Sequence, residues 1–289
     1  MILARDFRLS LEEKHNDREY NAAPGIRRSD LWRIRESPEK FKWARDHPEP
    51  QSSSLIFGSM VHKLLLEPDT FADEYIVAPQ IDRRTKAGKE EYAAFCESAK
   101  EKCVISLEDY ETATAMVGKA MADPSVAKLL MTGQHEVPYL WTDPDTGLAC
   151  KIKCDCVTQM PGLAVPVIVD YKTTTNAQTG AFIRDAVKYG YFFQAAMYSE
   201  GLKRATGLDA QPLFCFIVQE KKPPYAINTC TVSNDGLVKG MDIFRELIGI
   251  YRDCLETDDW YGYLGPTHTP NEISMPTWAE WTKEAANDD

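Results

Sequence analysis

Two aspartates and a lysine, close together in the chain, are the residues best suited to chemistry. The segment 151–172 is expected to form two strands joined by a turn, with Asp155 in the first strand and Asp170 at the end of the second. Side chains alternate between the faces of a strand, so Asp170 and Lys172 point to the same side. If the two strands pair, Asp155 lies beside Asp170. Two carboxylates and one ammonium group would then suit a hard divalent cation, with the lysine left for a water or a phosphate oxygen.

The elements that must position these residues follow from hydrophobic periodicity and turn signals. Helices are expected over 29–35, 39–45, 55–67, 90–102, 107–121, 125–131, 181–206 and 234–256, and strands over 75–78, 136–141, 148–158, 163–171, 213–219 and 225–232. The order is helices first, then three strands, a long helix, two strands and a last helix. It predicts an α/β core with a helical N-terminal region and a right-handed strand–helix–strand crossover.

Composition and charge limit the classes of protein. The 289 residues suffice for one large or two smaller domains, and the net charge of −11 argues against a nonspecific basic nucleic-acid binder. No apolar run approaches the ~18 residues of a membrane helix. The first residues contain no continuous apolar segment of the signal-peptide kind, so a cytoplasmic location and no membrane contact are expected.

The eight cysteines are spread over a chain too large to need a disulfide framework. Cys154 and Cys156 flank Asp155 and are expected to share the opposite face of its strand. No second Cys/His pair at zinc spacing follows them. Buried or half-buried thiols are therefore expected rather than a cysteine metal site.

Three further polar residues lie where expected elements would bring them near the aspartates. His62 interrupts an otherwise apolar helix and, taken alone, is more typical of a hydrogen-bonded core histidine. Gln194 and Tyr198 are four residues apart and share one face of the long helix.

Taken together, His62, Asp155, Asp170-Tyr171-Lys172 and Gln194-x-x-x-Tyr198 resemble, in this order, the motifs of the PD-(D/E)XK nuclease superfamily. The resemblance is strongest to its RecE-like (exodeoxyribonuclease VIII-type) and RecB-like exonucleases of phage or prophage type, and segments 20–32, 57–62 and 259–263 extend it. It implies one domain over 1–289, with a helical part at about 1–131, a catalytic core at about 132–257 and a C-terminal strap at 258–289. The implied fold is a restriction-endonuclease-like core, a central mixed β-sheet flanked by helices.

The resemblance also implies roles for these residues. Asp155, Asp170, the carbonyl of Tyr171 and His62 would bind one or two Mg²⁺ or Mn²⁺ ions, and Gln194 and Tyr198 would hydrogen-bond a metal-bound water or a DNA phosphate. Lys172 would orient the attacking water or stabilise the phosphate. A free lysine has a pKa near ~10.4, and two adjacent aspartates raise it further, so Lys172 is expected to be a fixed positive charge rather than a base.

Three other residues are weaker candidates. Glu136 precedes the strands and is more typical of an exposed turn residue, although several family members place an extra acid near the metal. Arg27 and Arg28 resemble positions near the DNA end, where they could grip a 5′-phosphate. Solvated surface charge is an equally good interpretation of both arginines.

The implied activity is resection of linear double-stranded DNA from the 5′ end, which leaves a 3′ strand for a RecT-like single-strand annealing protein. A ring-shaped homo-oligomer would allow processivity without a basic surface. One alternative is a catalytically silent binding module, but silent copies lack a metal carboxylate or the lysine, and none is missing here. Another is a different RecB-like nuclease, helicase-linked or Cas4-like. The Cas4-like group has an iron–sulfur cluster held by one N-terminal and three C-terminal cysteines, whereas here the first cysteine is Cys96 and only Cys254 lies near the end.

Overall fold

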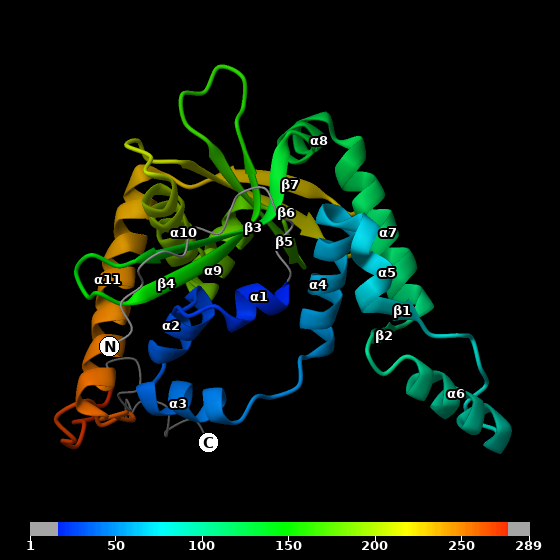
Figure 1. Ribbon diagram of the computed structural model, residues 1–289, viewed down its shortest axis with the longest axis horizontal. Coiled ribbons are helices and arrows are strands. Elements are labelled where there is room, and N and C mark those ends of the chain that lie inside the picture. The colour runs from blue at the N-terminus through cyan, green and yellow to red at the C-terminus, as the bar shows by residue number, and fades with distance from the viewer. Residues whose placement is uncertain (1–16, 277–289) are drawn as a thin grey trace, which may run out of the picture.

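A five-stranded mixed sheet forms the centre of the computed structural model, which describes residues 17–276 (Figure 1). Its strands, in spatial order, are β3 (Gly133–Thr142), β4 (Ala149–Thr158), β5 (Val167–Thr174), β6 (Leu213–Glu220) and β7 (Ile227–Thr231). The pair β5–β6 is parallel and the other three pairs are antiparallel. The predicted α/β fold, a central mixed sheet flanked by helices, is confirmed.

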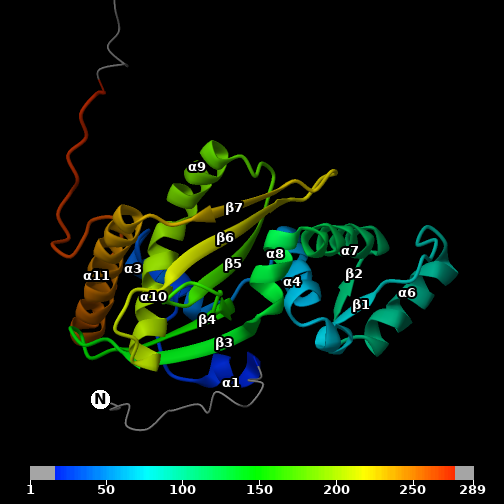
Figure 2. The ribbon, with the colours of Figure 1, turned by 90° about the horizontal axis from the view of Figure 1, so that it is seen from above.

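Helices cover both faces of this sheet (Figure 2). They are α1 (Asp17–Ala22), α2 (Arg28–Ile34), α3 (Pro38–Asp46), α4 (Ser53–Leu66), α5 (Phe71–Glu74), α6 (Lys86–Ser98), α7 (Leu107–Ala122), α8 (Pro124–Met131), α9 (Thr179–Tyr189), α10 (Tyr191–Thr206) and α11 (Asn234–Thr257), with a 3-10 turn, η1, at Pro68–Thr70. One core lies between the sheet and α2, α3, α9, α10 and α11, and a second lies between the sheet and α4, α7 and α8.

The alternation of β5 between these two cores sets the direction of its polar side chains. Val169 and Tyr171 pack in the core beside α4 and α7, whereas Ile168 packs beside α10. Asp170 has the parity of Ile168, and its side chain meets Gln194 of α10. The predicted alternation along this strand is therefore present.

The two cysteines on either side of Asp155 depart from the prediction. Cys154 packs in the core beside α10, but Cys156 packs in the core beside α4 and α7, so they do not share a face. Opposite Asp155, Glu136 has a φ of 52° and interrupts the ladder between the pairs His135–Cys156 and Val137–Cys154. This left-handed residue breaks the regular pleat, which explains why the alternation changes there.

The predicted long helix over 181–206 is also wrong, because it is two helices that meet at Gly190. Gly190 has a φ of 70°, and a Cβ there would lie 2.5–2.7 Å from ring atoms of Trp32. Only glycine meets both conditions at low cost. Sequence periodicity did not show this break, because both helices continue the apolar pattern across it.

Two smaller differences lie at the edges of the fold. A separate two-stranded parallel sheet joins β1 (Tyr75–Val77) to β2 (Cys103–Ile105), and only its first strand was predicted. After α11, Trp260 packs against Phe41 and Tyr251 at ring-centroid distances of 5.7 and 6.1 Å, while residues 277–289 of the predicted strap lie outside the described residues. Among residues 17–276, no helix is both long and apolar enough to span a bilayer.

Candidate active site

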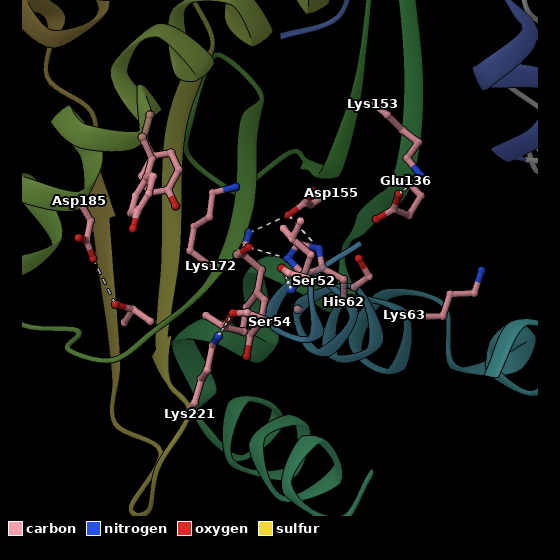
Figure 3. A pocket seen from close by; sticks show the side chains of 18 of the residues that line it. Ser52, Ser54, His62, Lys63, Glu136, Lys153, Asp155, Lys172, Asp185 and Lys221 are labelled. Carbon is pink, nitrogen blue, oxygen red and sulfur yellow. Dashed lines mark hydrogen bonds and ion pairs between the residues drawn. The ribbon is translucent and has the colours of Figure 1, made fainter. Parts of the chain in front are cut away.

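A cleft of about 890 Å³ opens where β4 and β5 separate. Side chains from α4, β3, β4, β5, α9 and α10 line it, as do Tyr20 of α1 and Lys221 after β6. Figure 3 shows His62, Glu136, Asp155 and Lys172 among them. The segments that form the cleft are therefore far apart in the sequence.

Asp155 and Asp170 lie where β4 and β5 separate. The last paired residues of the two strands are Cys156 and Val169, so both aspartates lie one position beyond the ladder. Asp155 Oδ2 accepts the backbone N–H of Tyr171 at 2.8 Å. This hydrogen bond takes the place of the next ladder bond and fixes the carboxylate at the mouth of the split.

A histidine and two carboxylates form the group that could hold a metal. One ligand atom from each of His62, Glu136 and Asp155 lies within 4.8 Å of the others, close to the roughly 4 Å between opposite ligands of Mg²⁺ at ~2.1 Å each. His62 Nδ1 is 3.4 Å from Asp155 Oδ2, and its Nε2 is 2.7 Å from the carbonyl oxygen of Tyr171 (Figure 3). The donor set of two carboxylates, an imidazole and a nearby carbonyl fits a divalent cation.

Glu136 belongs to this group although the sequence favoured an exposed turn residue. Its left-handed backbone costs about 1–3 kcal/mol, a strain of the kind that gathers at functional sites. Lys153 Nζ pairs with its carboxylate at 2.5 Å. The neighbouring His135 holds the strand in place, since its ring nitrogens lie 2.9 and 2.8 Å from the carbonyl oxygens of Leu66 in α4 and Leu130 in α8.

Asp170 lies beside this group rather than in it. It is 1% exposed, its Oδ1 accepts a hydrogen bond from Gln194, and its Oδ2 lies 2.5 Å from Lys172 Nζ. Oδ2 receives no hydrogen bond of acceptable geometry, although it is fully buried. The positive charge of Lys172 therefore compensates this buried oxygen, in place of a hydrogen bond of regular geometry. The structure thus brings Glu136 together with His62 and Asp155 and places Asp170 next to them, and the predicted ligand role of Asp170 stays a prediction.

Electrostatics at the site follow from burial and crowding. Burial, reinforced by Asp170, raises the pKa of Asp155 to about 7, although His62 and Lys172 oppose the shift. Burial lowers the pKa of Lys172, but Asp170 and Asp155 more than compensate, and the net pKa of the ammonium is raised. Lys172 is therefore charged at neutral pH and does not serve as a free base.

The remaining predicted residues differ in how close they come. Tyr198 lines the cleft, half-buried, and its ring packs edge-on against Phe214 at 6.4 Å. Arg27 pairs with Asp30 at 3.1 Å, and Arg28 donates a hydrogen bond to the carbonyl of Tyr189. Neither arginine lines the cleft, and both contacts are structural ones at the start of α2 and the end of α9.

Several cleft residues were not predicted. Lys153 is two residues before Asp155 on the same strand, so alternation alone could have indicated it. Lys221 reaches Ser54 at 3.1 Å across 167 residues, which no local signal could show. Tyr20 is held by Lys151, whose Nζ donates to the carbonyls of Tyr20 and Ala23 at 2.8 and 2.6 Å.

Comparison with known proteins adds a family to this geometry. The family described as a PDDEXK-like domain of unknown function (DUF3799) matches residues 29–268, and no curated protein matches the chain. A crystal structure from Eubacterium rectale, named "putative exonuclease", aligns with a TM-score of 0.57 at 15% identity, over 92% of this chain and 97% of that one. A structure of SSO0001 aligns over 66% and 85% at 14% identity, with a TM-score of 0.30.

At 15% identity the Eubacterium likeness concerns the fold alone. The family match rests on the sequence itself and spans the helices, the sheet and the cleft described above. It agrees with the resemblance drawn from His62, Asp155, Asp170 and Lys172. Because the match covers well over half of the 289 residues, the chain belongs to this PDDEXK-like family.

Proposed function

We propose that the protein is a metal-dependent nuclease that hydrolyses phosphodiester bonds in DNA. The observation that carries the proposal is the meeting of His62, Glu136, Asp155, Asp170 and Lys172 at one end of the sheet, in an open cleft. Carboxylates that are close, partly desolvated and paired with lysines are costly to maintain for structure alone. A divalent cation with an anionic substrate explains why all of them are present.

The three residues of the close group would hold Mg²⁺ or Mn²⁺, with Asp170 Oδ2 and the carbonyl of Tyr171 beside it. When bound, the ion would lower the pKa of a water and neutralise charge on the phosphate. Lys172 supplies a fixed positive charge next to Asp170. Gln194 holds the Asp170 carboxylate in one orientation through its side-chain N–H.

Part of the lining of the cleft has the chemistry of a phosphate-binding surface. Ser52, Ser54, Thr173 and Thr175 present hydroxyl groups to the cleft, and Lys221 lies against Ser54. Hydroxyls and lysines are common partners of the nucleic-acid backbone. A few local cations can therefore serve a chain whose net charge is −11.

The finer form of the proposal is an exodeoxyribonuclease that resects linear double-stranded DNA from the 5′ end. The order of the motifs supports it. The Eubacterium protein, which shares the fold, is itself named an exonuclease. A RecT-like annealing partner, a ring-shaped homo-oligomer and a cytoplasmic location belong to the same proposal. Arg28, next to the α9–α10 junction, could approach the DNA end only if it exchanged its contact with the Tyr189 carbonyl.

The alternatives are less well supported. A silent binding module would not need the Asp155–Asp170–Lys172 arrangement, which is complete here. An iron–sulfur nuclease would need clustered cysteines, but within residues 17–276 the metal-capable group is His62, Glu136 and Asp155, and Cys96 and Cys254 are free thiols.

Digestion of linear duplex DNA labelled at either the 5′ or the 3′ end tests the proposal. With Mg²⁺ or Mn²⁺ we expect release of labelled nucleotides, first from the 5′ label, and no release with EDTA. Asp155→Asn and Lys172→Ala should abolish it, whereas Asp209→Asn, at an exposed loop residue, should not. Absence of cleavage with both metals would overturn the proposal, and release from the 3′ label first would overturn only the stated polarity.

A further inference from the structure

One wall of the cleft is aromatic, and nothing in the metal site accounts for it. Phe182 and Tyr189 of α9 and Tyr191 of α10 all line the cleft. Phe182 is 4% exposed and Tyr191 is half-buried, but Tyr189 is 43% exposed. The wall therefore ends in one ring that is accessible from the cleft.

The position of this ring is fixed by the junction between α9 and α10. The chain turns at Gly190 with a φ of 70°, and Trp32 packs against the glycine where any side chain would collide. Arg28 donates a hydrogen bond to the carbonyl of Tyr189 itself. Contacts with Trp32 and Arg28 of α2 therefore fix the position of Tyr189 at the end of α9.

Further aromatic rings support it and connect it to the catalytic centre. The ring centroids of Tyr189 and Tyr191 are 5.9 Å apart, and Tyr191 is 5.7 Å from Phe182 and 5.6 Å from Phe216. Lys172 Nζ lies 5.1 Å from the centroid of Tyr191. The accessible ring is therefore one ring away from the ammonium group of Lys172.

We propose that Tyr189, supported by Tyr191, is a stacking platform for a nucleobase next to the phosphate held at Lys172. This inference rests on the proposed nuclease function and names a subsite within it. Every base has a flat π-face, and aromatic side chains beside cations are the usual partners of unpaired bases. Lys188 Nζ lies over the Tyr189 ring, 4.9 Å from its centroid, so a second cation adjoins the platform.

The size and chemistry of the cleft favour a base over other ligands. A volume of about 890 Å³ lies in the range of small-molecule pockets, so the cleft has room for a base beside the metal-capable group. An apolar ligand or peptide is disfavoured because Asp185 and Thr174, which hydrogen-bond to each other at 3.4 Å, also line the cleft. These groups provide polar partners for the edge of a base or for a sugar.

Binding of a short fluorescent single strand, with Ca²⁺ in place of Mg²⁺ so that it is not cleaved, tests the platform. One abasic residue is moved along the strand. The affinity of the wild type should fall about 5- to 150-fold when the abasic residue occupies one particular position of the strand. Tyr189→Ala should bind the intact strand with an affinity lower by a similar factor. Removal of that same base should then cause no further loss of affinity. Tyr189→Phe should bind like the wild type.

Tyr263→Ala is the matched control, since Tyr263 is 67% exposed and lies outside the cleft. Thermal unfolding of each variant shows that it is folded. The platform is overturned if the losses of binding free energy from Tyr189→Ala and from base removal are additive at every position of the strand. It is also overturned if Tyr189→Ala binds the intact strand as tightly as the wild type. A wild type that binds no strand at all would also overturn the platform, whereas the nuclease proposal on which it rests is decided separately by cleavage of the end-labelled duplex.

Discussion

Asp155 and Asp170 occupy equivalent places at the split between β4 and β5, yet their surroundings differ. Asp155 is partly exposed to the cleft and lies near His62 and Glu136. Asp170 is buried and already engaged by Lys172 and Gln194. The first arrangement leaves ligand atoms available to an ion from solution, whereas the second is an internal ion pair that holds a lysine in place. Two similar aspartates can therefore have separate roles, cation binding and charge positioning.

The largest expected effect comes from removing the Asp155 carboxylate. Asp155→Asn should reduce cleavage by roughly 10²- to 10³-fold or more, because the residue is both a proposed metal ligand and the acceptor of the Tyr171 N–H. Cleavage rates at saturating Mg²⁺ measure the effect. Activity within a few-fold of the wild type would show that the close group is not the metal site.

Glu136→Gln and Gln194→Ala test the comparison more directly. Glu136→Gln should weaken Mn²⁺ binding about 10- to 100-fold, because it removes the charge of a proposed ligand in the close group. Gln194→Ala should leave Mn²⁺ affinity nearly unchanged and lower the cleavage rate about 10-fold, because it frees the Asp170 carboxylate. Calorimetric titration with Mn²⁺ and single-turnover cleavage separate the two. The opposite pattern would exchange the proposed roles of Glu136 and Asp170.

The pH dependence of stability should differ between the wild type and Asp155→Asn. In the folded chain the pKa of Asp155 is raised by burial from 3.8 to about 7, so the folded state binds more protons between these values. The free energy of unfolding of the metal-free protein should then fall as pH rises from about 4 to 7, by at most ~1.4 kcal/mol per pH unit from this group.

Urea unfolding of metal-free protein at pH 5 and pH 7.5 measures this slope. Asp155→Asn should have the shallower slope and Asp209→Asn the slope of the wild type. Mg²⁺ should stabilise the wild type more at pH 7.5 than at pH 5, since it binds the ionised carboxylate. Equal slopes in the wild type and Asp155→Asn would contradict the raised pKa.

The smallest expected effect concerns Lys151, which holds α1 at the edge of the cleft. Lys151→Met should cost about 1.5–3 kcal/mol, because its ammonium group donates to backbone carbonyls of Tyr20, Asn21 and Ala23. The loss should be local, with faster hydrogen exchange in α1 and cleavage lowered only a few-fold. Uniformly faster exchange over the whole sheet would show that the contact supports the global fold instead.

Local patterns in the sequence were sufficient to predict much of the fold and of the candidate site. Alternation along a strand places Asp170 and Lys172 on one side, and the Gln194–Tyr198 spacing places both residues on one helix face. The order of the strands and helices gave the fold class, and the motif order gave the superfamily, which the family match confirms. These relations connect residues close in the chain or depend on their order, so no tertiary information is needed.

Only the tertiary structure decided which acid joins His62 and Asp155. Glu136 reaches them because β3 pairs with β4 in one register and because its own backbone adopts a left-handed conformation. The break at Gly190 likewise depends on Trp32, more than 150 residues earlier, as the Lys221–Ser54 contact depends on distant segments. Periodicity describes neighbours two to four residues apart. Cross-strand partners and strained backbone are set by packing between distant segments. The sequence therefore determined the types of group at the candidate site, and the fold determined their arrangement.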